Sequence, residues 1–393
     1  MVFVKGALPG EVVGVRTDRV TKQFAEATVV DVVDPSEWRT TPPCPEVANG
    51  CGGCDWQHAV PGYQSELRRA VVADAMRRIG KFPSEGPGAV AILAGPELPT
   101  EGYRTVLRAA VDDARAGFRR DRSHALVAGE RCLVAHPLAE ELLIDGRYPG
   151  ADEVRILVGA RTGDRMVVVR SAEPDADVSG VSVPDDVVVV TAAELRRGRL
   201  AFIHEEILGR RLRVSAGSFF QCRPDGAEVL VSLVGGALRD HHGERPVETL
   251  LDAYAGVGLF SATLAEGLAA RARPSRIIAV ESNPSSAADA RHNLAAGGYR
   301  AQVVEDQVER WPCEPIDAVV ADPSRRGLQR AGVDALAATG AATLVLVSCD
   351  PAALARDARL LVERGYRCDR VTVVDLFGHT SHVEAVSVFV RER

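Results

Sequence analysis

The sequence predicts an α/β protein whose last third is a doubly wound, largely parallel sheet of Rossmann-like type. From residue 216 onward, the apolar segments "ETLLDAYAG", "SRIIAVES", "IDAVVADP" and "AATLVLVSC" alternate with helical stretches, which is typical of βαβ units. The chain has 393 residues, of which 46% are hydrophobic, so it is long enough for two or three domains with packed cores. We therefore assign residues 216–393 to one α/β domain.

Two further domains are expected before it. Residues 1–40 contain the β-rich segments "VVGVRT" and "FAEATVVDVV", which predicts part of a small β-barrel. The Pro-rich "TTPPCP" marks a boundary, and residues 41–215 form the predicted central domain. It starts with a helical pattern, "GYQSELRRAVVADAMRRIG", and continues with strand-like segments such as "VRILVGA" and "RMVVVRS", so we expect it to be mostly β.

Composition restricts the class of protein. No apolar run approaches the roughly 20 residues of a membrane-spanning helix, and the N-terminus lacks the zones of a signal peptide, so we expect a cytoplasmic protein and no membrane partner. The net charge of −7 argues against a generally basic coat for nucleic acid, but it leaves room for a local basic groove. A monomer is the simplest expectation.

Three of the eight cysteines lie close together in "CPEVANGCGGCDWQH". In a reducing compartment, clustered cysteines are more often metal ligands or catalytic thiols than disulfides. Cys44, Cys51 and Cys54 need a fourth ligand, and Cys132 in "GERCLVAHP" offers one. On spacing alone, four thiolates hold a tetrahedral zinc ion or an iron–sulfur cluster equally well.

A cofactor site is predicted where the first strand of the α/β domain ends. In "LLDAYAGVGLFS", Gly256 and Gly258 lead into a helix, and Glu281 ends the next strand, where a carboxylate can accept hydrogen bonds from both ribose hydroxyls of a nucleoside cofactor. The third glycine of a dinucleotide site is replaced by Phe260 and Ser261, which favours a cofactor without phosphate, namely S-adenosylmethionine. The leading class is therefore a methyltransferase.

Further polar residues follow the remaining strands. Asp306 in "QVVEDQVE" is a candidate to receive the adenine amino group, with an ordinary surface carboxylate as the alternative. Cys349 in "LVLVSCDPAALARD" is a candidate nucleophile, with a buried core cysteine as the alternative. Glu384 in "HTSHVEAV" is a third candidate, and a surface acid is its alternative. All these residues are expected at the sheet edge where the cofactor lies.

Six motifs occur in the order found in the RNA uracil-5-methyltransferase family, whose members make 5-methyluridine in transfer RNA and in large-subunit ribosomal RNA. They are "CPEVANGCGGCDWQH", "SFFQCRPDGAEVL", "LLDAYAGVGLF", "DPSRRG", "VSCDPAALARD" and "HTSHVE". The resemblance covers nearly the whole chain. It implies a class I methyltransferase domain, S-adenosylmethionine as cofactor, and a 23S ribosomal RNA substrate in preference to transfer RNA.

The resemblance also implies residue roles. Cys349 matches the nucleophile that adds to carbon 6 of uracil, and Glu384 matches the general base that removes the carbon 5 proton. The positions that line the cofactor match Gln221, Tyr254, Leu259, Glu281, Asp306 and Asp322. The cysteine motif matches that of a [4Fe–4S] cluster in the central domain, on Cys44, Cys51, Cys54 and Cys132, and "VFVKGALPGEVVGVRT" matches the second half of the family's TRAM barrel.

The sequence departs from the family beside the nucleophile. The usual Asn after it is Asp350, and the usual Thr is Ala353. A carboxylate next to a thiol raises the pKa of the thiol unless a cation offsets it, and the candidate cations are Arg325, Arg326 and Arg356.

Three functions follow from these observations. The first is methylation of one uridine in folded RNA, which must be extruded from its stack to reach the thiol. The second is a catalytically weakened RNA-binding protein, and the third is a methyltransferase for a small molecule. Intact Cys349 and Glu384 favour the first over the second, and the barrel-like segment and cysteine cluster favour it over the third.

Overall fold

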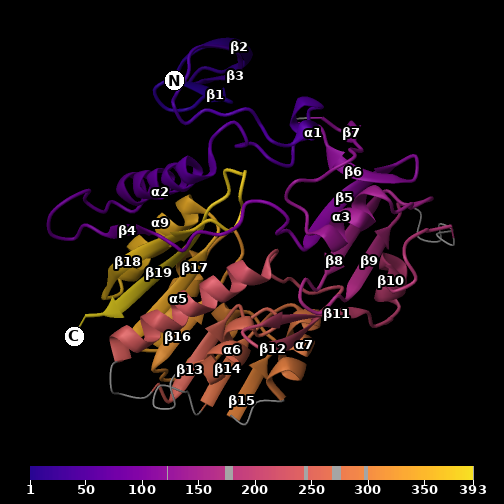
Figure 1. The fold of residues 1–393 in the computed structure, drawn as a ribbon. Coiled ribbons are helices and arrows are strands. Elements are labelled where there is room, and N and C mark those ends of the chain that lie inside the picture. Colours follow the sequence, from indigo (N-terminus) through magenta and orange to yellow (C-terminus); the bar gives the residue numbers. More distant parts are fainter. Residues whose placement is uncertain (122, 173–179, 243–246, 268–275, 296–299, 393) are drawn as a thin grey trace.

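The computed structural model describes residues 1–121, 123–172, 180–242, 247–267, 276–295 and 300–392. Figure 1 shows an N-terminal sheet, a central domain and a C-terminal α/β domain. Within the described residues, no helix is both long enough and apolar enough to cross a membrane.

The described residues of the C-terminal domain contribute to a sheet of eight strands in the order β15-β14-β13-β16-β17-β19-β18-β4. The first five in this order are mutually parallel, and β19 runs antiparallel to both of its neighbours. The strands are β13 (Thr249–Ala253), β14 (Arg276–Val280), β15 (Arg300–Val304), β16 (Ala318–Ala321), β17 (Thr343–Ser348), β18 (Tyr366–Val374), β19 (Glu384–Arg391) and β4 (Ala91–Ala94). The predicted doubly wound α/β fold is confirmed.

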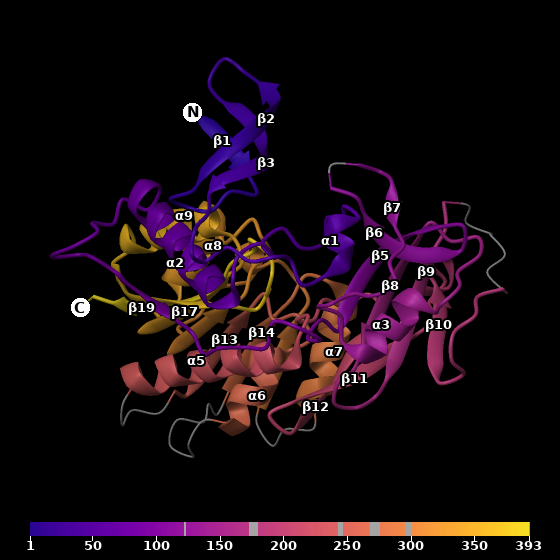
Figure 2. The same cartoon turned by 45° about the horizontal axis from the view of Figure 1, so that its top comes forward.

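Helices cover both faces of this sheet, as Figure 2 shows. Successive strand residues point to opposite faces, so Leu250 packs with α5 and α6 while Leu251 packs with α2, α8 and α9. This two-sided burial explains why the central strands are continuous apolar runs. The helices are α2 (Pro61–Arg78), α5 (Pro224–His242), α6 (Leu259–Gly267), α7 (Pro284–Ala295), α8 (Gln329–Ala338) and α9 (Pro351–Val362).

Helix α2 and strand β4 join the C-terminal layers, although the sequence assigned them to the central domain of residues 41–215. Strand β4 pairs in parallel with β18, with Ala91 opposite Arg370. In α2, Val72 and Met76 are buried in the same core cluster as residues of α9 and β18. Burial of this apolar stripe, rather than any local signal, attaches the segment to the C-terminal sheet.

The described part of the central domain is mostly β, as predicted. Its sheet has the order β10-β9-β8-β5-β6-β7, and a separate hairpin, β11–β12, leads to the C-terminal domain. The elements are β5 (Val106–Asp112), β6 (Arg115–Arg119), β7 (Leu126–Val127), β8 (Glu153–Val158), β9 (Arg165–Arg170), β10 (Val187–Thr191), β11 (Phe202–Ile207), β12 (Arg210–Ser215), and the helices α1 (Pro45–Ala48), α3 (Pro137–Ile144) and α4 (Ala192–Arg196).

Residues 1–40, all of them described, form a sheet of three strands in the order β1-β3-β2, comprising β1 (Val2–Lys5), β2 (Val12–Val20) and β3 (Ala25–Asp34). The partial barrel expected from the sequence is not confirmed, because these strands make an open sheet. Only Leu8 and Ala27 of this segment are buried. The carboxylate of Glu11 accepts hydrogen bonds from the amides of Leu8 and Ser36 and from the Arg39 guanidinium at 2.6 Å.

Substitution Glu11→Gln is expected to loosen this sheet. Hydrogen bonds with Arg39 hold the pKa of Glu11 at about 2, so the carboxylate contributes full stability above its unfolded pKa of about 4.3, and that contribution disappears as the pH falls toward 2. Loss of the charged hydrogen bonds should cost about 2 kcal/mol locally. Amide hydrogen exchange at pH 7 should accelerate in residues 1–36 and stay unchanged in β13–β17.

The matched control is Glu37→Gln, which changes an exposed carboxylate close to the same sheet. Equal exchange in the Glu11 and Glu37 variants would contradict the assigned role of Glu11.

Candidate active site

A cleft of about 1090 Å³ opens at the carboxyl ends of β13, β14, β16 and β17. This is the edge at which open α/β sheets bind their ligands. The predicted site residues that line it are Gln221, Tyr254, Leu259, Glu281, Asp322, Cys349 and Glu384. Asp306 is not among the lining residues, so one predicted position lies outside the cleft wall.

The turn after β13 lines one part of the cleft. Tyr254 has φ +61°, and Gly256 and Gly258 also have positive φ, so the chain turns sharply from strand to α6. The Glu281 carboxylate accepts hydrogen bonds from the amides of Gly256 at 2.9 Å and Asn283 at 2.6 Å. These two bonds fix the carboxylate between the ends of β13 and β14, and each oxygen retains a lone pair for a ligand.

Two lining residues after β15 were missed from the sequence. Gln307 and Glu309 both line the cleft, and Glu309 lies in the short helix η1 (Val308–Arg310). The Tyr254 hydroxyl donates to Glu309 at 2.8 Å, while Asp306 accepts from the Gln307 amide. The signal was present, since polar residues after a parallel strand face this edge, but it does not say which of several neighbours points inward.

Strand pairing brings Cys349 and Glu384 to the same place. Cys349 follows β17, Glu384 begins β19, and the antiparallel register places Ser348 opposite Ala385. Both residues line the cleft; Cys349 is half-buried and Glu384 is 3% exposed. A strand end and a strand start that are distant in sequence are therefore adjacent at the cleft.

Carboxyl groups dominate the electrostatics around Cys349. The Gln221 amide donates to Asp322 at 3.2 Å. Burial, with a contribution from the nearby Asp252, raises the pKa of Asp322 to about 7. Burial and the neighbouring Asp322 also raise the pKa of Glu384 well above its usual range. Both carboxyl groups therefore hold protons more tightly than they would in water.

The same carboxyl groups disfavour ionisation of the Cys349 thiol. Burial, together with the nearby Glu384 and Asp322, raises its pKa to about 11, and Arg325 acts in the opposite direction. In the unliganded protein at neutral pH, the sulfur is therefore predominantly protonated. Arg325 is exposed at the cleft rim, so its charge is partly screened.

The structure changes the interpretation of Asp350. The sequence suggested that its carboxylate would raise the pKa of the adjacent thiol, whereas in the structure Asp350 is the N-cap of α9 and accepts a hydrogen bond from the Ala353 amide at 2.7 Å. The carboxyl groups that act on the thiol are Glu384 and Asp322. Of the candidate cations, Arg325 is the one that lowers the pKa of the thiol, whereas Arg356 pairs with Asp357 at 2.9 Å.

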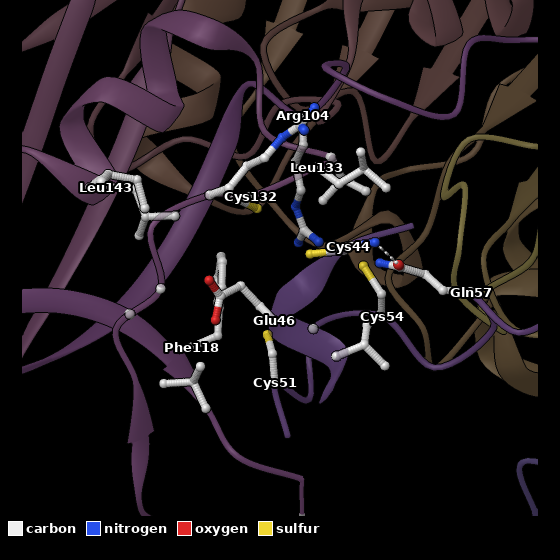
Figure 3. A pocket seen from close by; sticks show the side chains of 18 of the residues that line it. Cys44, Glu46, Cys51, Cys54, Gln57, Arg104, Phe118, Cys132, Leu133 and Leu143 are labelled. Atoms are coloured by element: carbon white, nitrogen blue, oxygen red, sulfur yellow. Dashed lines mark hydrogen bonds between the residues drawn. The ribbon is translucent and has the colours of Figure 1, made fainter. Parts of the chain in front are cut away.

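A second, smaller pocket lies in the central domain and is shown in Figure 3. Cys44, Cys51, Cys54 and Cys132 line this space of about 40 Å³, together with the Arg104 side chain. The Cys44 amide donates to Gln57 at 3.0 Å. In the described part of the chain, no group of three or more His, Cys, Asp or Glu side chains converges closely enough to hold a metal ion. The four thiols line the same space.

Comparison with known proteins identifies close relatives. No model of a known protein family matches the chain. It is 36% identical to an uncharacterized RNA methyltransferase of Streptomyces coelicolor, over 99% of this chain and 87% of that protein. It is 32% identical to the 23S rRNA (uracil(1939)-C(5))-methyltransferase RlmD of Alkalilimnicola ehrlichii, over 99% of this chain and 92% of that protein.

Among solved structures, the fold is similar over nearly its full length to that of another methyltransferase. This is the tRNA (uracil-54, C5)-methyltransferase of Pyrococcus abyssi in complex with S-adenosyl-L-homocysteine, with a TM-score of 0.73 and 24% sequence identity. The match covers 98% of this chain and 95% of that one. It supports the domain architecture described above.

Alkylation should report the thiol pKa directly. In the protein without ligands, the rate of Cys349 modification by iodoacetamide should rise about tenfold per pH unit between pH 7 and 10, because the thiolate fraction grows until the pKa of about 11 is reached. Peptide mass spectrometry after digestion would follow Cys349 separately from the other cysteines.

Arg325→Met should slow this modification at pH 8 by about threefold, since a partly screened charge shifts a pKa by roughly half a unit. Arg330→Met removes an exposed arginine that does not line the cleft and should leave the rate unchanged. A pH-independent rate would refute the raised pKa.

Proposed function

Because the chain belongs to the family of RNA uracil-C5-methyltransferases, we propose that it transfers a methyl group from S-adenosylmethionine to carbon 5 of one uridine in RNA through a covalent adduct on Cys349. The observation that carries the proposal is the placement of Cys349 and Glu384 together in the cleft where parallel strands end. Ribosomal RNA is the favoured substrate, since relatives that are 32% and 30% identical are named as 23S rRNA enzymes.

The residues present fit S-adenosylmethionine. The Glu281 carboxylate is fixed by two backbone amides and has acceptor capacity left for the ribose hydroxyls. The turn at Gly256 leads into α6 without a third glycine, as expected for a cofactor that brings no pyrophosphate. When bound, the cofactor supplies an electrophilic methyl group. Leu259 and Tyr254 line the same part of the cleft, and Gln221 links it to Asp322.

Carbon 5 of uracil is a poor nucleophile, so the reaction needs Cys349. Its thiolate adds to carbon 6, and the electron pair of the carbon 5–carbon 6 double bond moves toward the carbonyl oxygen as an enolate. Carbon 5 then forms a bond to the methyl carbon, the methyl–sulfur bond breaks, and the sulfur keeps the electron pair as a neutral thioether. Glu384 accepts the proton from carbon 5, the double bond re-forms, and the thiolate is expelled from carbon 6. Glu384 must be ionised to accept this proton, and the positive charge of a bound cofactor favours the ionised form of a buried carboxyl group.

Ionisation of the thiol is the first requirement of this sequence. With a pKa of about 11, Cys349 must release its proton when ligands bind, and Asp322, with a pKa of about 7, is a neighbouring acceptor. The positive charge of Arg325 favours the thiolate. A bound cationic cofactor would add a second positive charge next to the buried carboxyl groups.

For the cysteine pocket we propose a [4Fe–4S] cluster on Cys44, Cys51, Cys54 and Cys132. A tetrahedral zinc ion would draw its sulfurs to within about 3.8 Å of one another and leave no space between them. The space of about 40 Å³ among the thiols supports a larger group instead. Arg104, which also lines this pocket, is a suitable neighbour for the negative charge of four thiolates. The methylation described above requires no electron transfer, so the cluster's role is structural.

RNA containing 5-fluorouridine should test the reaction. Fluorine cannot leave carbon 5 as a cation, so the enzyme should remain covalently attached to a methylated 5-fluorouridine transcript. Cys349→Ala should abolish this adduct while S-adenosylmethionine binding is retained. Denaturing gel electrophoresis would detect the adduct, and calorimetry would measure cofactor binding.

Cys222→Ala is the matched control, because Cys222 is the other cysteine that lines the cleft. Transcripts of 23S ribosomal RNA and of transfer RNA should be compared, with adduct expected on the ribosomal transcript. Adduct on transfer RNA alone would reassign the substrate, and adduct that survives Cys349→Ala would refute the nucleophile.

Metal analysis should test the cluster. Anaerobically purified protein should be brown, with about four iron and four labile sulfide per chain. Cys132→Ser should lower the iron content, whereas Cys313→Ser, which changes an exposed cysteine outside the pocket, should not. Colourless protein with one zinc per chain would reject the cluster in favour of zinc.

A further inference from the structure

The loop that precedes Glu384 is irregular and needs support from elsewhere. Residues 375–383 connect β18 to β19, and His379 within them has φ +65°. Such a segment does not pair its own backbone groups in a ladder, so its buried carbonyl groups require other donors. Because β19 begins at Glu384, the path of this loop sets the position from which the Glu384 side chain enters the cleft.

One buried arginine from α2 supplies most of these donors. Arg68 is 1% exposed, and its Nε donates to the His382 carbonyl at 3.1 Å. One terminal nitrogen donates to the carbonyls of Thr380 at 2.7 Å and Phe377 at 3.0 Å, and the other donates to the Asp375 carboxylate at 2.8 Å. A guanidinium has five donors in a rigid fork, which a flexible ammonium cannot reproduce. The fork therefore fixes the loop at both ends and in the middle.

The segment that follows Cys54 holds the same loop from a second side. Asp55 accepts hydrogen bonds from the Ser381 amide at 2.8 Å and the Ser381 hydroxyl at 2.6 Å. The Trp56 amide donates to the His379 carbonyl at 3.0 Å, and the Trp56 ring lies over the Arg68 guanidinium at 5.5 Å. Gln64, also on α2, accepts from the His379 amide at 2.8 Å.

We propose that Arg68, assisted by Asp55, is a positioning residue that aligns Glu384 for removal of the carbon 5 proton. The inference rests on the proposed methylation of uracil. The donor to His382 acts only two residues before Glu384, so a displaced loop displaces the general base directly. Arg68 itself does not line the cleft.

The nucleophile depends on a different part of the fold. Cys349 follows β17, a strand whose residues are all buried, and it precedes the helix α9 that Asp350 caps. No hydrogen bond of Arg68 in the described structure goes to that segment. Loss of Arg68 should therefore spare thiol addition and methyl transfer and slow the step that follows them.

The two stages can be measured separately. RNA with tritium at carbon 5 of the target uridine releases tritium only when the proton is removed, whereas 5-fluorouridine RNA traps the adduct before that step. For Arg68→Met we expect about 100-fold slower tritium release, because misplacing a catalytic group by about 1 Å costs this much. Covalent enzyme–RNA complex should accumulate on ordinary RNA, and the adduct with 5-fluorouridine RNA should form at least as fast as with the wild type, because a displaced Glu384 raises the pKa of the Cys349 thiol less.

Arg78→Met is the matched control, since Arg78 lies on the same helix, is 66% exposed in its side chain and pairs only with Asp74 in the described structure. It should match the wild type in both assays. Arg68→Lys keeps the charge but loses the fork, and it should release tritium at a rate between those of the wild type and Arg68→Met.

Ser381→Ala provides a second test should Arg68→Met fail to fold, as judged by its thermal unfolding. It removes one of the two hydrogen bonds to Asp55, so tritium release should slow less than in Arg68→Met, with the same accumulation of complex. Equal losses of adduct formation and tritium release, or wild-type behaviour of the folded variants, would overturn the positioning role. A wild-type enzyme that forms no adduct and releases no tritium would instead refute the proposed function.

Discussion

The insertion of β19 between β17 and β18 is the constraint on which the site depends. Because β19 runs against its neighbours, its first residue lies at the edge where the parallel strands end, and Glu384 arrives beside Cys349. A parallel β19 would place the same residue at the opposite edge, roughly 20 Å away. This antiparallel pairing places the residue that follows β17 next to the first residue of β19. The cleft therefore holds a thiol and a carboxyl group close together, in addition to the turn that follows β13.

The buried carboxyl groups favour a ligand with a positive charge in this cleft. Asp252, Asp322 and Glu384 lie near one another, and burial raises the pKa of each. Carboxyl groups in such surroundings are relieved by a positive charge, which is the charge that the proposed cofactor carries. The same groups favour the protonated thiol in the unliganded protein, so the proposed nucleophile must ionise when ligands bind.

The sequence was sufficient for the central strands, for the turn at Gly256, and for the positions of Asp322 and Cys349, because each follows from a local pattern and the rule for parallel sheets. Glu384 was expected at the same edge, but it arrives there as the first residue of an antiparallel strand, which that rule does not predict. The sequence was insufficient for α2 and β4, whose partners are remote strands and helices. Asp350 was misjudged because sequence adjacency to a thiol says nothing about a helix cap. The sequence also does not show which of several neighbouring polar side chains points into the cleft. Residues that follow Asp306 line it, and Asp306 does not.

The contacts of Arg68 have a consequence for synthesis of the chain. Its partners in the loop lie 307 to 314 positions further along. At about 5–20 residues per second, a ribosome makes those partners roughly 15 to 60 seconds after α2. Through that interval the guanidinium has none of its loop carbonyls, and the loop that orients Glu384 does not yet exist. The active centre therefore assembles late in synthesis, when two segments that are far apart in the sequence come into contact.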